Sequence, residues 1–374
     1  MKVVADDKIP FLKGVLESEG IEVVYLPGAK TTAEDVSNAD ALITRTRTKC
    51  NEKLLKNSAV KFIATATIGF DHIDTDYVEK RGICWTNAPG CNSSSVAQYI
   101  TSLLLNLAVK HNFKLADKVL GVVGVGYVGK KVAAVGRALG MKVLLNDPPR
   151  ARAEGNKEFV SLDIIAQQAD IITIHVPLEY EGEDKTFHLA DEKFLNKLTQ
   201  KQFIINASRG EVVDNAALRK TLEKRSIAGG VLDVWENEPE IDLELLDLLD
   251  YATPHIAGYS TDGKVNGTSM SVNALAKFFN LSECLQNWYP DNVPVPENTV
   301  IECPADGSPE EKLLYIVSQS YNIADDTKAL KQTPQDFEKL RGSYPLRREF
   351  GIFTVVNADS QCAEILKNLG FKVN

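Results

Sequence analysis

Three polar motifs, each directly after an apolar run, carry the side chains of this sequence that are best suited to proton and anion chemistry. Arg209 lies in the motif NASRG, Glu238 in VWENEP and His255 in TPHIAGY. An imidazole can accept and return a proton near neutral pH, and a carboxylate bonded to its second nitrogen orients it. A guanidinium can hold a carboxylate. The three types predict a catalytic site; the alternative is a surface ion pair, a solvated acid and a packed histidine.

A glycine-rich turn stands before these motifs. Gly124, Gly126 and Gly129 fit the pattern G-x-G-x-x-G between an expected strand over 119–123 and an expected helix over 128–139. The first glycine allows a tight turn, the second lets the backbone approach a pyrophosphate, and the third lets the helix pack close to the strand. The turn therefore predicts that these three glycines bind a dinucleotide, and the alternative is a glycine turn without a ligand.

The residues after this turn bear on which dinucleotide is bound. Asp147 ends the next expected strand, 18 residues beyond Gly129. A carboxylate at this place can accept hydrogen bonds from both ribose hydroxyls, and it repels a 2′-phosphate. Arg150 and Arg152 lie nearby and could instead bind a 2′-phosphate. The pattern predicts NAD as the cofactor, with NADP as the alternative.

Apolar runs of strand length alternate with amphipathic segments over most of the chain, and this alternation predicts parallel sheets covered by helices. In the first part we expect strands over 2–4, 22–26, 41–43, 62–66 and 83–85. After a long helix that begins near 93–95, we expect strands over 119–123, 142–146, 171–175, 203–206 and 230–233. The amphipathic segment 264–285 could then cross back to the first domain.

Three prolines between 290 and 296 predict an extended linker, beyond which strand and helix patterns resume. The predicted fold class is therefore α/β, with two doubly wound parallel-sheet domains and a small C-terminal α/β domain. We expect the first domain over 1–92 and 257–288, a Rossmann domain over 93–256, and the third domain over 289–374.

The three polar motifs, in this order behind the glycine turn, resemble those of the NAD-dependent D-2-hydroxyacid dehydrogenases over residues 1 to about 285. The resemblance implies hydride transfer between carbon 2 of a 2-hydroxy acid and NAD. It implies that His255 is the acid and base, that Glu238 is its partner, and that Arg209 holds the substrate carboxylate. It also implies that the first domain binds the substrate.

Further stretches are similar to one branch of that family, which acts on a small phosphorylated 2-hydroxy acid. They include ATATIG at 64–69, NDPPRA at 146–151 and the appended third domain, which implies a homodimer formed through 289–374. By position, the resemblance implies Thr46, Thr67 and Tyr259 as substrate-binding residues. The residues that it implies for NAD are Tyr127, Val128, Asp147, Val176, Ala207, Ser208, Arg209, Asp233 and Gly258.

A substrate phosphate needs cations that these motifs do not supply. Arg45 and Arg47 flank Thr46 after an expected strand, and Arg347 and Arg348 precede another in the third domain. We therefore expect Arg45 or Arg47 to bind the phosphate, together with Arg347 or Arg348 from a partner subunit. The alternative is that these are ordinary surface arginines.

Composition narrows the possible partners. The 374 residues include 42 Lys or Arg and 51 Asp or Glu, a formal charge of −9 that disfavours nucleic acids and membrane surfaces as partners. The six cysteines form no C-x-x-C pair, and we expect no metal site. The first residues include acids, and no run approaches the roughly 18 apolar residues of a membrane span. We expect a soluble, cytoplasmic protein.

Three alternative functions are also compatible with the sequence. A dehydrogenase of the 3-phosphoglycerate type would need the same three catalytic residues. Some relatives are NAD-sensing corepressors that bind peptide motifs, and the acidic balance does not exclude that function. A dinucleotide-binding subunit with a purely structural role would keep its function when His255 is replaced.

Overall fold

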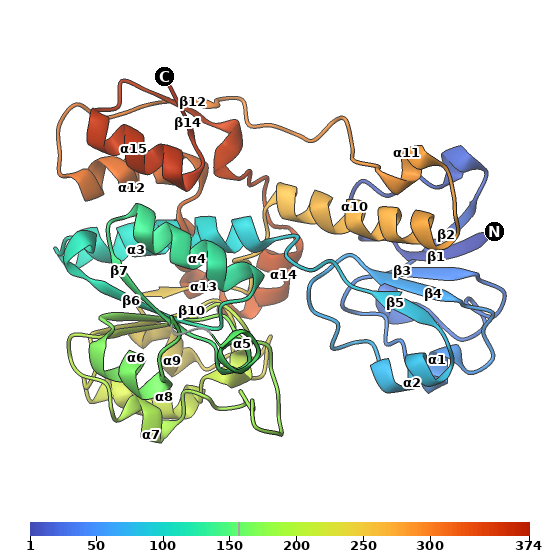
Figure 1. Cartoon of the computed structure of the whole chain (residues 1–374), viewed down its shortest axis with the longest axis horizontal. Coiled ribbons are helices and arrows are strands. Elements are labelled where there is room, and N and C mark those ends of the chain that lie inside the picture. The colour runs from blue at the N-terminus through green and yellow to red at the C-terminus, as the bar shows by residue number, and fades with distance from the viewer. Residues whose placement is uncertain (156–157) are drawn as a thin grey trace. The chain divides into compact units, whose positions relative to one another are not determined.

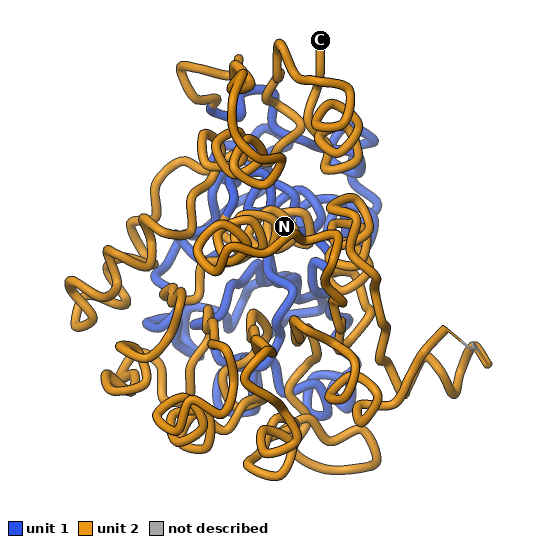
Figure 2. The backbone as a smooth tube through the Cα atoms, turned by 90° about the vertical axis from the view of Figure 1, so that its left-hand side faces the viewer, with its two compact units in different colours: residues 1–92, 260–294 blue, residues 93–259, 295–374 orange. Residues whose placement is uncertain are grey.

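The computed structural model describes residues 1–155 and 158–374, which divide into two compact units (Figure 2). The first unit comprises residues 1–92 and 260–294, and the second comprises residues 93–259 and 295–374. The C-terminal residues thus belong to the same compact unit as the glycine-rich turn, whereas the sequence pattern assigns 289–374 a domain of its own.

The first unit is built on a parallel five-stranded sheet in the order β2-β1-β3-β4-β5. Its strands are β1 (Lys2–Asp6), β2 (Glu22–Leu26), β3 (Ala41–Thr44), β4 (Phe62–Thr65) and β5 (Cys84–Thr86). Its helices are α1 (Glu52–Leu55), α2 (Thr75–Lys80), α10 (Thr261–Phe278) and α11 (Glu283–Gln286) (Figure 1). Because successive strand side chains point to opposite faces, two apolar cores form, one beneath α10 and the other beneath α1 and α2.

The second unit contains a parallel six-stranded sheet in the order β11-β10-β9-β8-β6-β7. Its strands are β6 (Val119–Val123), β7 (Lys142–Asn146), β8 (Ile171–Ile174), β9 (Phe203–Asn206), β10 (Gly229–Leu232) and β11 (Tyr251–Ala252). Its helices are α3 (Ser93–Lys110), α4 (Tyr127–Ala138), α5 (Pro148–Glu154), α6 (Leu162–Gln168), α7 (Glu192–Leu195), α8 (Asn215–Glu223) and α9 (Leu243–Leu248). The strand order reverses at β6, and ligands of open parallel sheets bind at the carboxyl ends of strands beside such a reversal.

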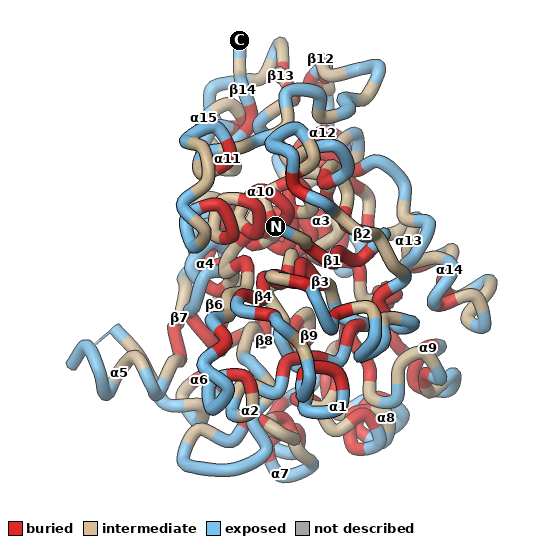
Figure 3. The backbone as a smooth tube through the Cα atoms, turned by 90° about the vertical axis from the view of Figure 1, so that its right-hand side faces the viewer, coloured by how far each residue is buried: buried red, intermediate tan, exposed pale blue. Residues whose placement is uncertain are grey.

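The C-terminal residues of the second unit form a parallel sheet in the order β12-β13-β14. Its strands are β12 (Val300–Glu302), β13 (Thr354–Val356) and β14 (Lys372–Val373), and its helices are α12 (Pro309–Ser320), α13 (Ile323–Gln332), α14 (Phe337–Gly342) and α15 (Ser360–Leu369). These elements pack on α3, α4 and β11 and share their apolar core. Helix α3 is consequently buried over almost its whole length (Figure 3).

The parallel sheets confirm the predicted α/β class. The segment 264–285 is not one helix, because α10 ends at Phe278 and Asn280 adopts a φ of 51° before α11 begins. The pattern predicts no element over α13 or α14, whose apolar residues are sparse. Among the helices within 1–155 and 158–374, none has the length and apolar character of a membrane span.

Candidate active site

His255 and Glu238 form a hydrogen-bonded pair. His255 Nδ1 lies 2.8 Å from Glu238 Oε2, and the backbone N–H of Trp235 donates to Glu238 Oε1 at 2.9 Å. Burial alone raises the pKa of the Glu238 carboxyl, but the hydrogen bond and charge of His255, with the Trp235 N–H, outweigh burial and hold that pKa below its usual value. An ionised carboxylate in this position can orient the imidazole and stabilise its protonated form.

A buried carboxylate fixes the backbone around His255. Asp233 Oδ1 accepts hydrogen bonds from Thr253 Oγ1 at 2.6 Å and from the Ile256 N–H at 2.7 Å, and Oδ2 accepts one from the Ala257 N–H at 3.0 Å. His255 has a φ of 57°, in the left-handed region that side-chain-bearing residues seldom adopt. Both oxygens of Asp233 therefore hold the His255 loop, a role that the sequence did not indicate. Its contact with NAD stays a prediction.

The strand register places Arg209 at the same sheet edge as His255. In the parallel ladders of β9, β10 and β11, Asn206 pairs with Leu232, and Leu232 pairs with Ala252. Arg209 follows Asn206 by three residues, and His255 follows Ala252 by three residues. Two side chains at equal distances beyond paired positions lie at one edge of the sheet.

Close packing joins the Arg209 turn to the loop that carries Glu238. A Cβ atom added to Gly210 would lie 2.0 Å from the backbone oxygen of Trp235, so this approach requires glycine. Asn206 fixes the turn from within, because its Nδ2 donates to the backbone oxygen of Arg209 at 2.7 Å and its Oδ1 accepts from the Ser208 N–H at 3.1 Å. The structure thus brings the loops of all three catalytic motifs together.

The glycine-rich turn has the geometry that a dinucleotide requires. Gly124 has a φ of 83°, and a Cβ atom there would lie 2.5 Å from the backbone oxygen of His175. A Cβ atom at Gly129 would lie 1.9 Å from the Gly124 oxygen, whereas one at Gly126 would meet nothing within 4 Å. Gly126 caps α4 without a side-chain hydrogen bond. The first N–H groups of α4 therefore suit a pyrophosphate, and the residues fit NAD.

The surroundings of Asp147 favour NAD over NADP. Asp147 Oδ1 accepts a hydrogen bond from the Arg150 N–H at 3.1 Å, and Oδ2 accepts one from a backbone N–H of the glycine-rich turn at 2.8 Å. The Arg150 guanidinium donates to both carboxylate oxygens of Glu154, at 2.7 and 2.8 Å, and Arg152 pairs with Asp184. Because both arginines have carboxylate partners, they are poorly placed to bind a 2′-phosphate.

The other residues expected to bind NAD follow the carboxyl ends of four strands in the same sheet. They are Tyr127 and Val128 after β6, Val176 after β8, Ala207 and Ser208 after β9, and Gly258 after β11. Tyr127 is 64% exposed, and a Cβ atom at Gly124 would lie 2.8 Å from Val176 Cγ1. These positions suit a cofactor laid across the sheet edge, while the individual contacts stay predictions.

The first unit carries most of the residues expected to bind substrate. Arg45, Thr46 and Arg47 follow β3, and Thr67 follows β4. Thr67 Oγ1 donates to the backbone oxygen of Gly69 at 2.9 Å, and Arg45 Nη1 donates to a backbone oxygen at 3.3 Å. Thr46 and Arg47 are exposed. All four residues lie at the carboxyl edge of their sheet, where ligands of such sheets bind, and their substrate contacts stay predictions.

His72 has a structural environment. Its Nε2 lies 3.2 Å from Thr44 Oγ1, and burial lowers the pKa of its imidazole to about 4. Within the described parts of the chain, no group of three or more His, Cys, Asp or Glu residues is arranged to hold a metal ion.

The burial and the hydrogen bonds of Arg347 contradict the expectation that this residue binds a substrate phosphate. It is 3% exposed, and each of its three nitrogens donates to its own chain: Nε to Gln98 Oε1 at 2.8 Å, Nη1 to the Ile256 oxygen at 3.2 Å and Nη2 to the Ser95 oxygen at 2.6 Å. The guanidinium also lies 3.8 Å from the ring centroid of Tyr321. Arg347 therefore ties the C-terminal residues to α3 and to the backbone directly after His255.

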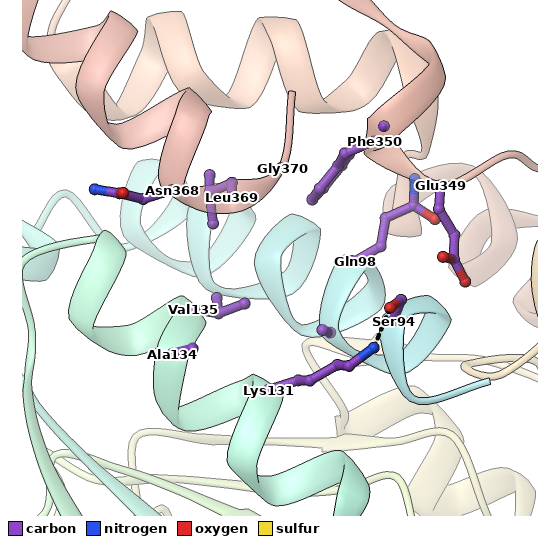
Figure 4. A pocket seen from close by; sticks show the side chains of 12 residues that line it. Ser94, Gln98, Lys131, Ala134, Val135, Glu349, Phe350, Asn368, Leu369 and Gly370 are labelled. Atoms are coloured by element: carbon purple, nitrogen blue, oxygen red, sulfur yellow. Dashed lines mark hydrogen bonds between the residues drawn. The ribbon is translucent and has the colours of Figure 1, made fainter. Parts of the chain in front are cut away.

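A pocket elsewhere in the second unit contains none of the candidate catalytic residues. It lies between α3, α4 and the C-terminal residues, and Figure 4 shows Lys131 reaching Ser94 Oγ across it. Its remaining charged residue is Glu349, and apolar side chains such as Val135 and Leu369 complete the lining. Because Arg209, Glu238 and His255 are all absent from this lining, the pocket is not the candidate active site.

Comparison with known families identifies two parts of the chain. Residues 105–257 match the NAD binding domain of the D-isomer specific 2-hydroxyacid dehydrogenases, and residues 293–370 match a domain of unknown function. An erythronate-4-phosphate dehydrogenase of Bacteroides thetaiotaomicron is 51% identical over 95% of this chain and 99% of its own length. The enzyme of that name from Porphyromonas gingivalis is 40% identical over 99% of this chain and 100% of its own length.

Solved structures resemble the larger part of the chain. The NAD-bound 3-phosphoglycerate dehydrogenase of Entamoeba histolytica is 26% identical, with a TM-score of 0.64 over 75% of this chain and 95% of its own. The D-lactate dehydrogenase of Aquifex aeolicus, in complex with NAD and lactic acid, is 26% identical, with a TM-score of 0.60 over 75% of this chain and 96% of its own.

Proposed function

The chain belongs to the erythronate-4-phosphate dehydrogenase family of D-isomer specific 2-hydroxyacid dehydrogenases, and from that premise we propose that it oxidises 4-phospho-D-erythronate at carbon 2. The product is 3-hydroxy-2-oxo-4-phosphooxybutanoate, formed in the biosynthesis of pyridoxal phosphate. The observation that carries the proposal is the His255–Glu238 pair, held at the sheet edge where the dinucleotide turn also ends.

The proposed chemistry divides between proton transfer and hydride transfer. His255 Nε2 accepts the proton of the hydroxyl on carbon 2, and the electron pair of the broken O–H bond forms the second bond of the carbonyl. The C–H bond of carbon 2 breaks in the same step, and its electron pair leaves with the hydrogen as a hydride. Bound NAD supplies the acceptor for the hydride. Glu238 stabilises the resulting imidazolium, and Arg209 holds the substrate carboxylate beside the developing carbonyl oxygen.

A substrate panel tests the proposal. The appearance of reduced nicotinamide is followed with 4-phospho-D-erythronate, 3-phosphoglycerate and D-lactate, each with NAD and with NADP. We expect 4-phospho-D-erythronate with NAD to give the highest kcat/KM, and His255→Gln to lower it by about 10²-fold or more. Preference for 3-phosphoglycerate or lactate would reject the substrate, and full activity of the His255 variant would reject the proposed acid and base.

We further propose that the protein is a cytoplasmic homodimer that assembles through its C-terminal residues. Two apolar side chains there support an interface: Val300 on the edge strand β12 is 63% exposed, and Tyr315 on α12 is 48% exposed. Exposed apolar edges of this kind commonly mark association surfaces. Sedimentation should show a dimer that Tyr315→Lys weakens and that Leu243→Lys, at a 55% exposed leucine on α9, does not. A monomeric parent protein would contradict the proposal.

A further inference from the structure

Arg341, on the C-terminal helix α14, extends its guanidinium to a residue expected to bind substrate. Its Cζ atom lies 5.5 Å from the ring centroid of Tyr259, and the ring of Tyr344 meets the same tyrosine edge-on at 6.1 Å between centroids. Tyr259 follows His255 by four residues, and its N–H donates to the Ile256 oxygen at 2.9 Å. A cation from the C-terminal residues therefore lies beside the His255 loop of its own unit.

This guanidinium lacks the partners that a structural arginine has. Within residues 1–155 and 158–374, Arg341 makes a cation–π contact with Tyr259 and neither a hydrogen bond nor an ion pair, and its Nε is buried without an acceptor. Arg347, six residues further along, donates from each of its nitrogens. A buried cationic N–H without an acceptor is costly, so a position of this kind favours an anion that arrives from outside the chain.

The charge of Arg341 reaches the catalytic pair without being neutralised there. The pKa of Glu238 lies below its usual value. Burial, which raises this pKa, is the largest influence on it, followed by His255 and the Trp235 N–H, which lower it. The charge of Arg341 is a smaller influence that also lowers it. Both oxygens of Glu238 already have partners, because Oε1 accepts from Trp235 and Oε2 contacts His255. The positive charge of Arg341 thus remains available to an anion that binds beside Tyr259.

We propose that Arg341 binds the 4-phosphate of the substrate and thereby selects phosphorylated acids over unphosphorylated ones. The inference rests on the proposed function, which assigns the substrate carboxylate to Arg209. The phosphate is then the anion left without a cation in the second unit. A planar guanidinium offers several N–H donors to phosphate oxygens, and an arginine stacked on an aromatic ring is held ready for them.

The test compares Arg341→Gln and Arg341→Lys with Lys339→Gln, a control on the same helix whose side chain is 77% exposed. Kinetic constants are measured with 4-phospho-D-erythronate and with D-erythronate, which lacks the phosphate. We expect Arg341→Gln to raise KM for the phosphorylated acid by about 10- to 100-fold and to change KM for D-erythronate by less than about threefold. Arg341→Lys should recover part of the loss, and Lys339→Gln should match the parent.

Calorimetry with inorganic phosphate, carried out on the protein with NADH, gives a readout that is independent of turnover. Parent and Lys339→Gln proteins should bind phosphate with the same Kd, and Arg341→Gln should bind it at least about tenfold more weakly. Equal Kd values, an equal rise of KM for both acids, or a fall of kcat alone would overturn the proposal. A parent protein that ignores 4-phospho-D-erythronate but binds phosphate through Arg341 would instead reject the proposed substrate and keep this inference.

Discussion

The imidazole of His255 is held by Glu238 while its backbone is held by a different carboxylate. His255 Nδ1 lies 2.8 Å from Glu238 Oε2, and the residues on either side of His255 bind Asp233 through the Thr253 hydroxyl and two backbone N–H groups. The two carboxylates come from one loop, directly after β10. The contact that orients the ring and the contacts that place the backbone are therefore separate, and each can be removed by its own substitution.

Glu238→Gln should keep the side chain's size and remove its charge. We expect kcat/KM for oxidation to fall by about 10²-fold, because a neutral amide stabilises the imidazolium poorly. The pKa of Glu238 lies below its usual value, so this carboxylate stays ionised over the neutral range and the acid limb of the pH–rate profile does not belong to it. Steady-state kinetics check this prediction, and an unchanged kcat/KM in the variant would remove Glu238 from its assigned role.

Thr253→Val tests the backbone anchor. The substitution removes the hydroxyl that donates to Asp233 Oδ1 at 2.6 Å and lies 2.9 Å from the Tyr99 hydroxyl. Because these groups are buried, we expect a loss of about 1–3 kcal/mol in the free energy of unfolding, together with a lower kcat. Thr101→Val is the matched control: Thr101 is equally buried but donates only to the Ala97 oxygen of its own helix. Urea unfolding and kcat should separate the two variants, and equal effects would argue against the anchor.

The sheet edge could be predicted from the sequence, because Arg209, Glu238 and His255 each follow an apolar strand and parallel strands end together. The role of Asp233 could not, since spacing does not distinguish a carboxylate that faces a ribose from one that accepts three hydrogen bonds from its own protein. The same limit applies to Arg347 and Arg341. Their burial and partners depend on contacts between segments more than 80 residues apart in the sequence, such as Arg341 and Tyr259.

Cofactor choice gives a further prediction. Asp147→Ser removes the carboxylate that repels a 2′-phosphate, and Glu154→Gln weakens the hold on Arg150, which now donates to Glu154 at 2.7 and 2.8 Å. The double variant should lose about tenfold or more in its preference for NAD over NADP, a change of at least about 1.4 kcal/mol. Asp147→Ser alone should lose less, because Arg150 stays paired. The measurement is the ratio of kcat/KM with NAD to kcat/KM with NADP. An unchanged ratio in the double variant would show that Asp147 does not recognise the ribose hydroxyls.

Acid should destabilise the first unit through His72. Burial lowers the pKa of this imidazole from 6.5 to about 4, so between these values the unfolded chain binds a proton that the folded chain does not. The stabilising contribution is complete above about pH 6.5 and is lost as the pH falls towards 4, by about 2–3 kcal/mol at pH 4.5. His72→Gln, which keeps a polar group near Thr44 and does not titrate, should make urea-unfolding stability fall less steeply across this window. If the stability of the variant falls with decreasing pH as steeply as that of the parent protein, another group takes up the proton. Burial lowers the pKa of His175 to about 3, so His175 is the next residue to replace.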